Sequence, residues 1–325
     1  MSELPEGLAS LLPDHARGWE PPVELPRGHI VIAEKPLRPV AEVRWASPEW
    51  LVAAKADPST MYDGLPRPPM CWLTEAPVSV GLWSHLRAEH HRSGLWPLLV
   101  LRGGEGFGWY AEDESSLARL DPVTLMSQWW PGVGRLTKFD RRILGIARPE
   151  EWPGLAPPGT PRIDPDLLAD ETAEGKVAVE PARIALVPAA RSADSIGLAG
   201  WSPTDYESYS PGAASAVLRT WEERFGARVI GVGSGTLWVS VAAPPTTIEH
   251  AARVAVEHFS FCPEVEQVVF PEPEDLRDVE RLQGFVAKET ERLAHTFGVK
   301  PDWHSYFLQY SSDIVDRQVW EFWWD

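Results

Sequence analysis

Cysteine is scarce in this sequence. Only Cys71 and Cys262 occur among 325 residues, so the chain has no disulfide framework of the kind that stabilises small secreted domains. The N-terminal segment MSELPEGLASLLPD also lacks the basic start and the long apolar run of a signal peptide. These absences predict a protein that works in a reducing compartment, and we expect it to be cytoplasmic.

Long apolar runs and positive charge are scarce as well. No stretch approaches the roughly 20 apolar residues that a helix needs to cross a bilayer. Asp and Glu number 47 against 30 Lys and Arg, which leaves a net charge of −17. Nucleic-acid backbones and anionic membrane surfaces attract clustered Lys and Arg. The charge therefore argues against both as partners, and it is compatible with a basic protein partner.

Tryptophan and proline are abundant instead, with 17 and 32 residues. A flat Trp ring can stack on a sugar or a nucleobase, but most Trp residues here lie inside apolar segments, which favours core packing. The length is sufficient for a sizeable core and suggests two domains. The hydrophobic fraction, 44%, and the charged fraction, 24%, are those of a globular protein.

The clearest pattern is found in residues 210–242. Ser210 followed by Pro211 is typical of a helix N-terminus, and Gly226 is typical of a residue that ends a helix. Residues 236–241 alternate as a strand does. The apolar face of the expected helix consists of Ala214, Val217, Leu218, Trp221 and Phe225.

Gly231, Gly233 and Gly235 resemble a phosphate-binding loop at first sight. Such a loop joins a strand to the N-terminus of a helix, whose N–H groups and dipole meet the phosphate. Here a strand follows the glycines instead of a helix. We therefore interpret them as a β-hairpin turn.

Residues 149–182 are rich in Pro, Gly, Asp and Glu and lack periodicity, which is typical of a linker. This interpretation divides the chain into an N-terminal α+β domain, residues 1–148, and a C-terminal domain, residues 183–325. Residues 1–28 are expected to be a loose lead-in. The other expected elements of the N-terminal domain are strands at 29–33, 71–74 and 95–101, helices at 48–55, 80–91 and 122–130, and a glycine-rich turn at 103–108.

The C-terminal domain has the element order of a ferredoxin-like split βαβ fold. A strand at 183–188 precedes the central helix and hairpin, and a second helix begins at Thr246 with Glu249 three residues later, as in a capping box. A fourth strand, a long helix and an aromatic terminal strand are expected at 266–270, 274–297 and 319–325. The terminal strand has to be paired or covered, because an exposed aromatic edge promotes aggregation.

Three segments of this C-terminal part resemble a known family. They are TWEERFGARVIGVGSGTLWVSVAAPP, EHFSFCPE and the terminal FWWD. Together they resemble an uncharacterised bacterial family, common in actinobacteria, that is called domain of unknown function 4253. The resemblance is good over 183–270 and the last few residues and moderate over 70–132, and the segment 271–318 is longer than the family leads us to expect. It implies no catalytic residues, and by analogy alone it suggests a toxin-immunity or partner-binding module.

His258 and Cys262 are one helical turn apart, a spacing that metal ligands use. Without a third ligand nearby they make a poor zinc site, and His250 falls with Arg253 and Glu257 on the expected polar face of the same helix. A catalytic Cys–His pair would need an exposed cysteine with a lowered pKa. We expect a packed cysteine, a hydrogen-bonded histidine, and neither a metal nor a cofactor.

A cationic patch is expected at the end of the helix at 80–91. It contains His85, His90 and His91 together with Arg87 and Arg92, in an otherwise acidic chain. Such a patch could hold an anionic small ligand. Positive residues are also favoured near a helix C-terminus because of the helix dipole, and we prefer this interpretation.

Glu222 and Glu223, with the acidic segment 205–207, supply carboxylates near the central helix. Paired carboxylates can act as acid and base when they lie about 5–10 Å apart across a substrate. Neighbouring residues of a helix point about 100° apart, so these two do not converge. Trp221 and Arg224 are more typical of packing and of a salt-bridge framework.

The sequence therefore favours a non-catalytic binding module that uses an acidic surface, with toxin neutralisation as its narrowest form. The alternative is a hydrolase-like enzyme with an active site between the two domains. No residue is assigned a catalytic role. The candidate binding residues are Trp221, Glu222, Glu223, Arg224, His85, His90, His91, His258 and Cys262.

Overall fold

A computed structural model describes six stretches of the chain. They are residues 4–33, 69–101, 112–130, 151–203, 210–262 and 303–324. The helices expected at 48–55 and 274–297, the turn expected at 103–108 and the strand expected at 266–270 lie outside the described residues.

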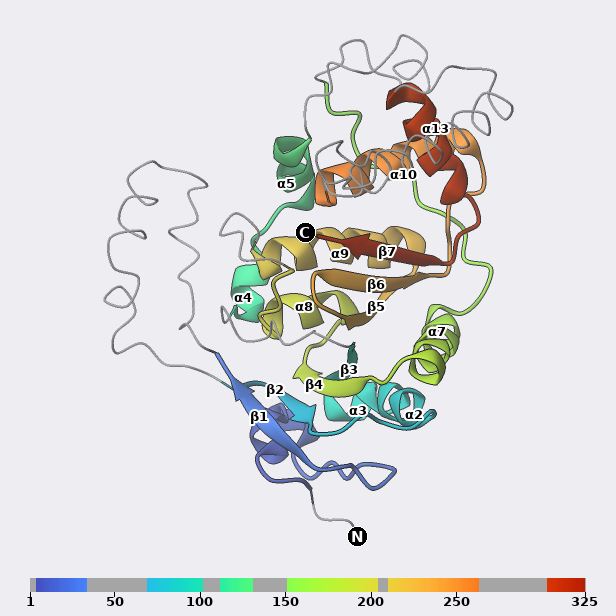
Figure 1. Ribbon diagram of the computed structural model, residues 1–325. Coiled ribbons are helices and arrows are strands. Elements are labelled where there is room, and N and C mark those ends of the chain that lie inside the picture. The colour runs from blue at the N-terminus through green and yellow to red at the C-terminus, as the bar shows by residue number, and fades with distance from the viewer. Residues whose placement is uncertain are drawn as a thin grey trace, which may run out of the picture.

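The described strands form one mixed sheet (Figure 1). They are β1 (Gly28–Ile32), β2 (Pro69–Thr74), β3 (Leu95–Val100), β4 (Arg183–Pro188), β5 (Ala227–Val232), β6 (Thr236–Val241) and β7 (Val319–Trp323). Their order across the sheet is β1-β2-β4-β3-β5-β6-β7. β3 and β5 are parallel, and the other neighbouring strands are antiparallel. The expectation of an α+β fold is confirmed.

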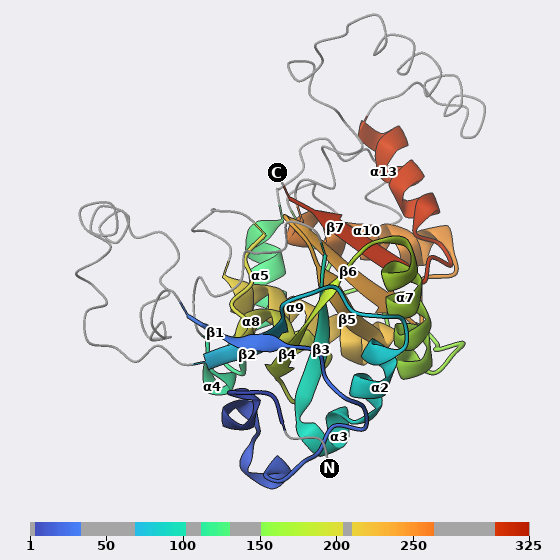
Figure 2. The ribbon, with the colours of Figure 1, turned by 60° about the horizontal axis from the view of Figure 1, so that its bottom comes forward.

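Helices pack on both faces of this sheet. The α-helices are α2 (Leu82–Ala88), α3 (His90–Ser93), α4 (Glu114–Leu117), α5 (Pro122–Trp129), α7 (Pro165–Val179), α8 (Ser195–Leu198), α9 (Pro211–Phe225), α10 (Ile248–Phe261) and α13 (Trp303–Asp313). Short 3₁₀ helices are η1 (Leu8–Leu11), η2 (Asp14–Ala16) and η5 (Ser192–Asp194). α10 and α13 lie side by side, as do α2 and α7 (Figures 1 and 2).

Contacts of β7 show which helices cover each face of the sheet. The Phe322 ring of β7 packs against Trp221 of α9 and Phe261 of α10, with ring centroids 5.3 and 5.1 Å away. Its neighbour Glu321 points to the opposite face, because side chains alternate along a strand. On that face the Lys176 ammonium of α7 lies 3.9 Å from the Glu321 carboxylate. α9 and α10 thus cover one face and α7 covers the other.

The central helix and hairpin agree with the sequence. The Ser210 side chain accepts a hydrogen bond from the Ala213 N–H, Pro211 is the first helical residue, and Gly226 ends α9 with a φ of 59°. The whole predicted apolar stripe is buried. β5 and β6 form the hairpin, and a Cβ on Gly231 would overlap Leu99 of β3, so this glycine allows the strands to approach closely.

The expected linker and the ferredoxin-like order differ from the structure. Residues 165–179 of the expected linker form α7, and Asp164 caps that helix. The ferredoxin-like order places the first strand of the domain, β4, beside the third, β6. In the described sheet β4 lies between β2 and β3 instead. Strands from both sides of 149–182 therefore alternate in one sheet, because β3 of the N-terminal part is inserted between β4 and β5.

Smaller differences concern element ends. The second helix of the C-terminal part is capped by Thr247, one residue later than expected. The helix expected at 80–91 is divided into α2 and α3. The lead-in contributes to the core, since Leu8 of η1 is fully buried. The strands expected at 29–33, 71–74 and 95–101 are confirmed to within two residues, and the terminal strand is paired with β6.

Candidate functional site

The four candidate residues of α9 face two different neighbours. Trp221 and Arg224 contact α10, whereas Glu222 and Glu223 contact the segment 191–193. The two carboxylates both reach the Arg191 guanidinium, at 3.9 and 2.9 Å, so they are engaged by a cation of the same chain.

A buried carboxylate organises the contact between α9 and α10. Glu257 has no exposed surface, and the Arg224 guanidinium donates to both of its oxygens at 2.9 and 2.7 Å. The Trp221 indole N–H donates at 2.8 Å, and the Ala156 backbone N–H donates at 2.6 Å. Each oxygen thus accepts two hydrogen bonds, as a buried carboxylate requires.

The sequence predicts Glu257 on the polar face of its helix, and this prediction is wrong because Glu257 is fully buried. The neighbouring side chains Val256 and His258 are also buried. The signal in the sequence is the apolar run VAVEHFSF, in which so many positions are apolar that the helix has little solvent-facing surface there. A carboxylate inside such a run needs a partner, and Arg224 supplies it.

His258 and Cys262 are both buried beside this cluster. The His258 Nδ1 lies 2.9 Å from the Tyr310 hydroxyl, and the His258 ring packs edge-on against Trp320 at 4.4 Å. Burial lowers the pKa of His258 to about 3, and the nearby charges of Arg317 and Arg224 add to this effect, so the ring is neutral at pH 7.

Cys262 is in a similar environment. Its Sγ donates to the Trp323 carbonyl oxygen at 3.1 Å, and its side chain is fully buried. The structure thus shows the packed cysteine and hydrogen-bonded histidine that the sequence favours. In the part of the chain that the structure describes, no three His, Cys, Asp or Glu side chains gather as metal ligands would.

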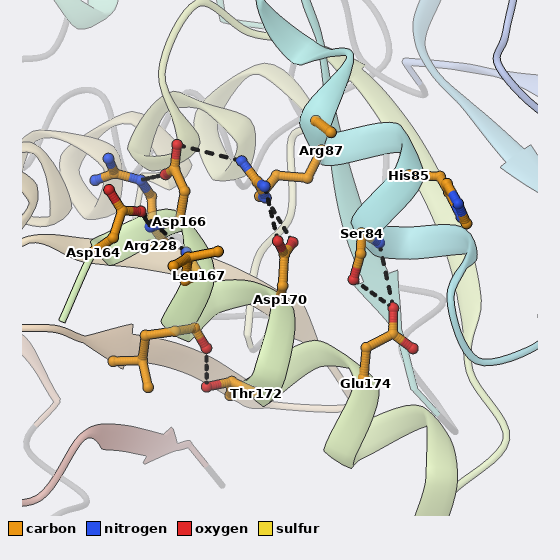
Figure 3. Close-up of polar contacts among 12 residues, drawn as sticks. Ser84, His85, Arg87, Asp164, Asp166, Leu167, Asp170, Thr172, Glu174 and Arg228 are labelled. Atoms are coloured by element: carbon orange, nitrogen blue, oxygen red, sulfur yellow. Dashed lines mark hydrogen bonds and ion pairs between the residues drawn. The ribbon is translucent and has the colours of Figure 1, made fainter.

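Arg87 of the cationic patch is paired with acidic residues of α7 (Figure 3). Arg87 donates through Nε and Nη2 to the two oxygens of Asp170 at 2.6 and 2.8 Å, and its Nη1 lies 3.3 Å from Asp166. The hydrogen bond to Asp170 raises the pKa of Arg87. The Arg228 Nε donates to Asp166 at 2.8 Å, so α7 connects α2 with β5.

The three histidines of the patch do not converge. His85 Nδ1 lies 2.6 Å from the Gly81 carbonyl, and His91 Nδ1 lies 3.0 Å from the Ala88 carbonyl. His90 Nε2 lies 2.7 Å from the Ala189 carbonyl, and burial lowers the pKa of His90. Each imidazole thus contacts a different backbone carbonyl, and only that of Ala88 lies at the C-terminal end of a helix.

Glu222 and Glu223 differ in exposure. The Glu222 carboxylate accepts from the Ser192 hydroxyl at 2.8 Å, and its side chain is 16% exposed. The Glu223 carboxylate pairs with Arg191 at 2.9 Å and is 60% exposed. Glu223 is therefore the candidate residue of α9 that an outside partner can reach.

Comparisons with known proteins agree with the resemblance seen in the sequence. Residues 183–325 match the model of a family described as Domain of unknown function (DUF4253). Neither the curated proteins nor the solved structures contain a match to this chain. Among the described residues, no helix combines the length and the apolar character that crossing a membrane requires.

Proposed function

We propose that this protein, whose residues 183–325 match that family, is a non-catalytic module that binds a basic protein through its acidic surface. The observation that supports the proposal is the distribution of its charges. Many of the described cations are already paired with carboxylates of the same chain; they include Arg87, Arg162, Arg191, Arg219, Arg224 and Arg228. With a net charge of −17, the chain has more carboxylates than cations that could pair with them.

Such a surface attracts a cationic partner over a distance set by the ionic strength, about 8–10 Å in ordinary buffers. Electrostatic attraction of this kind acts on the association rate more than on the dissociation rate. We propose that the protein acts in the cytoplasm, and that neutralisation of a basic toxin is the narrowest form of this function.

A hydrolase-like enzyme with a site between two domains has less support. It requires carboxylates that face a substrate, whereas Glu222 and Glu223 both contact residues 191–193 of the same chain and lie within 3.9 and 2.9 Å of the Arg191 guanidinium. It also requires a cleft at the expected boundary, whereas the sheet continues across the strands on both sides of that boundary.

Cross-linking followed by mass spectrometry would identify the partner, and stopped-flow mixing would then measure its association. We expect the association rate to fall steeply between 20 and 150 mM salt, because the electrostatic screening length shortens over this range, while the dissociation rate changes little. Glu223→Lys should lower the association rate more than the control Glu249→Lys, which reverses an exposed charge on α10. Recovery of a neutral or acidic partner, or turnover of a small molecule in an activity screen, would contradict the proposal.

A further inference from the structure

Residues 156–162, Ala-Pro-Pro-Gly-Thr-Pro-Arg, cross the ends of α9, α10 and β6 without forming a helix or strand. We call this segment the strap. It was expected to be part of a linker, yet its backbone is hydrogen-bonded along its length. The partners of these bonds all lie in residues 183–325, whereas the strap precedes that region.

Ala156 is held at both of its backbone polar groups. Its N–H donates to the Glu257 carboxylate at 2.6 Å, and its carbonyl accepts from the Arg224 guanidinium at 2.9 Å. The Arg224–Glu257 ion pair therefore presents one donor and one acceptor to a single residue of an extended chain. The Ala156 side chain is buried, at 2% exposure, so a small residue fits at this position.

The rest of the strap is also held mainly by contacts to its backbone. The His250 Nε2 lies 2.8 Å from the Pro157 carbonyl oxygen, and the Gly159 N–H donates to the Arg224 carbonyl at 3.0 Å. The Arg162 N–H donates to the Ala242 carbonyl at 3.1 Å, and its guanidinium pairs with Asp316 at 2.8 Å. The prolines between these positions have no N–H that needs an acceptor, and they favour an extended chain.

Gly159 is the position with the strictest steric requirement. A Cβ added there would overlap the Ala243 carbonyl oxygen and crowd the Ala243 side chain. The residues that contact the strap thus accept a small residue, then a glycine three positions later, then a residue with a backbone N–H and a cationic side chain. This is the pattern of a recognition site for extended peptides, with backbone hydrogen bonds for affinity and steric limits for specificity.

We propose that the residues of α9 and α10 and the segment after β6 that contact the strap form a peptide-binding site, and that the strap occupies this site as an exchangeable internal ligand. The chemical class that it takes is an extended, proline-containing segment of the form Ala-Pro-Pro-Gly-x-Pro-Arg. The proposal goes beyond the binding of a basic partner, because it depends on neither the acidic surface nor the identity of that partner. A tethered segment competes at an effective concentration in the millimolar range, so a peptide in solution binds only weakly while the strap is in place.

The test uses the full chain with Gly159→Val, which should displace the strap from this site, and Thr160→Val as the matched control at an exposed strap position. The probe is a fluorescein-labelled synthetic peptide of residues 153–163, followed by fluorescence anisotropy. We expect the peptide to bind the Gly159→Val chain at least about tenfold more tightly than the wild-type or Thr160→Val chain, since competition by the strap is lost.

Two altered peptides define the specificity. One carries Val in place of Gly159, and the other carries Pro in place of Ala156, which removes the N–H that Glu257 accepts. Neither should bind the Gly159→Val chain. In that chain trypsin should also cut after Arg162 sooner than in the wild type.

The proposal is wrong if the Gly159→Val chain keeps the wild-type circular dichroism and melting transition yet does not bind the peptide. It is also wrong if the Gly159→Val chain fails to fold, because the strap would then be an integral part of the core. Equal binding of the peptide to all three chains, or equal binding of the altered peptides, would likewise overturn it.

Discussion

At the scale of single residues, the Glu257 carboxylate connects three segments that are distant in the sequence. Its four hydrogen bonds come from Arg224 and Trp221 of α9 and from Ala156 of the strap. Burying the Arg224–Glu257 pair costs hydration free energy, and its favourable geometry offsets that cost only while both partners are present. Removing one partner leaves the other charge buried and unpaired.

The first prediction concerns this pair. Glu257→Ala should lower the free energy of unfolding by about 3–5 kcal/mol, because Arg224, whose side chain is 14% exposed, then stays largely buried without its carboxylate. Urea denaturation followed by Trp fluorescence measures the change. Glu249→Ala, at an exposed position of the same helix, is the control and should change stability by less than about 0.5 kcal/mol. Similar effects of the two substitutions would contradict the buried pair.

The second prediction concerns His258 and pH. Its pKa is about 3 in the folded chain against a usual value of 6.5, so between these values the unfolded chain binds the additional proton. The free energy of unfolding should therefore rise with pH across this window, by up to about 1.4 kcal/mol per pH unit for one group. This contribution is complete above pH 6.5 and is lost as the pH falls toward 3.

Unfolding curves at pH 7, 6, 5 and 4, values chosen to span that window, test the prediction. His258→Gln should reduce the slope of stability against pH, because Gln takes up no proton. The control is His91→Gln, an exposed position, which should leave the slope close to that of the wild type. His90 has a pKa shifted in the same direction, so part of the slope should remain in both variants.

At the scale of elements, helix α9 is the part that the sequence predicts best. Its cap, its glycine end and its apolar stripe are local signals, and all three are confirmed. The spacing of His258 and Cys262 likewise predicts that they share one side of α10. The sequence does not predict that His258 contacts Tyr310 or that the Ala156 N–H donates to Glu257, because these contacts join residues 52 and 101 positions apart.

The third prediction concerns the buried face of α9. The Trp221 ring has no exposed surface and stacks on Phe322 with an interplanar angle of 18°. Trp221→Ala should lower the free energy of unfolding by about 3–5 kcal/mol, through the cavity and the lost apolar burial. Trp221→Phe keeps an aromatic ring in the core, so it should lower the free energy of unfolding by less than Trp221→Ala does. It should still be destabilising, because Glu257 loses the hydrogen bond from the Trp221 indole. An unchanged melting temperature for Trp221→Ala would mean that the stripe is not part of the core.

At the scale of the whole molecule, the two halves of the chain are interleaved and cap each other's helices. Glu112 accepts from the Ser210 hydroxyl and the Gly212 N–H at the start of α9. Glu174 of α7 accepts from the Gly81 N–H and the Ser84 hydroxyl at the start of α2. Composition alone could not predict this arrangement. A Pro- and Gly-rich segment has the same composition whether it is a free linker or is held by backbone hydrogen bonds.

The fourth prediction concerns proteolysis. The sequence suggests that 149–182 is the first segment to be cut, since linkers make few buried contacts. The strap and α7 make many, and we therefore expect trypsin to cut the wild-type chain after Arg162 and Lys176 later than at other sites. Mass spectrometry of the first fragments measures the order. Early cleavage after Arg162 would show that the strap is largely free in the wild type.

The place of β3 has a consequence for synthesis on the ribosome. Every residue of β3 is buried, and its two edges are covered by β4 and β5. Val100 pairs with Val232, about 130 residues later, which a ribosome adds on the order of ten seconds afterwards. During that interval β3, with the sequence LWPLLV, has no β5 beside it, so its open edge can pair with other chains. We therefore expect the newly made chain, and not the finished protein, to be the form that aggregates and engages chaperones.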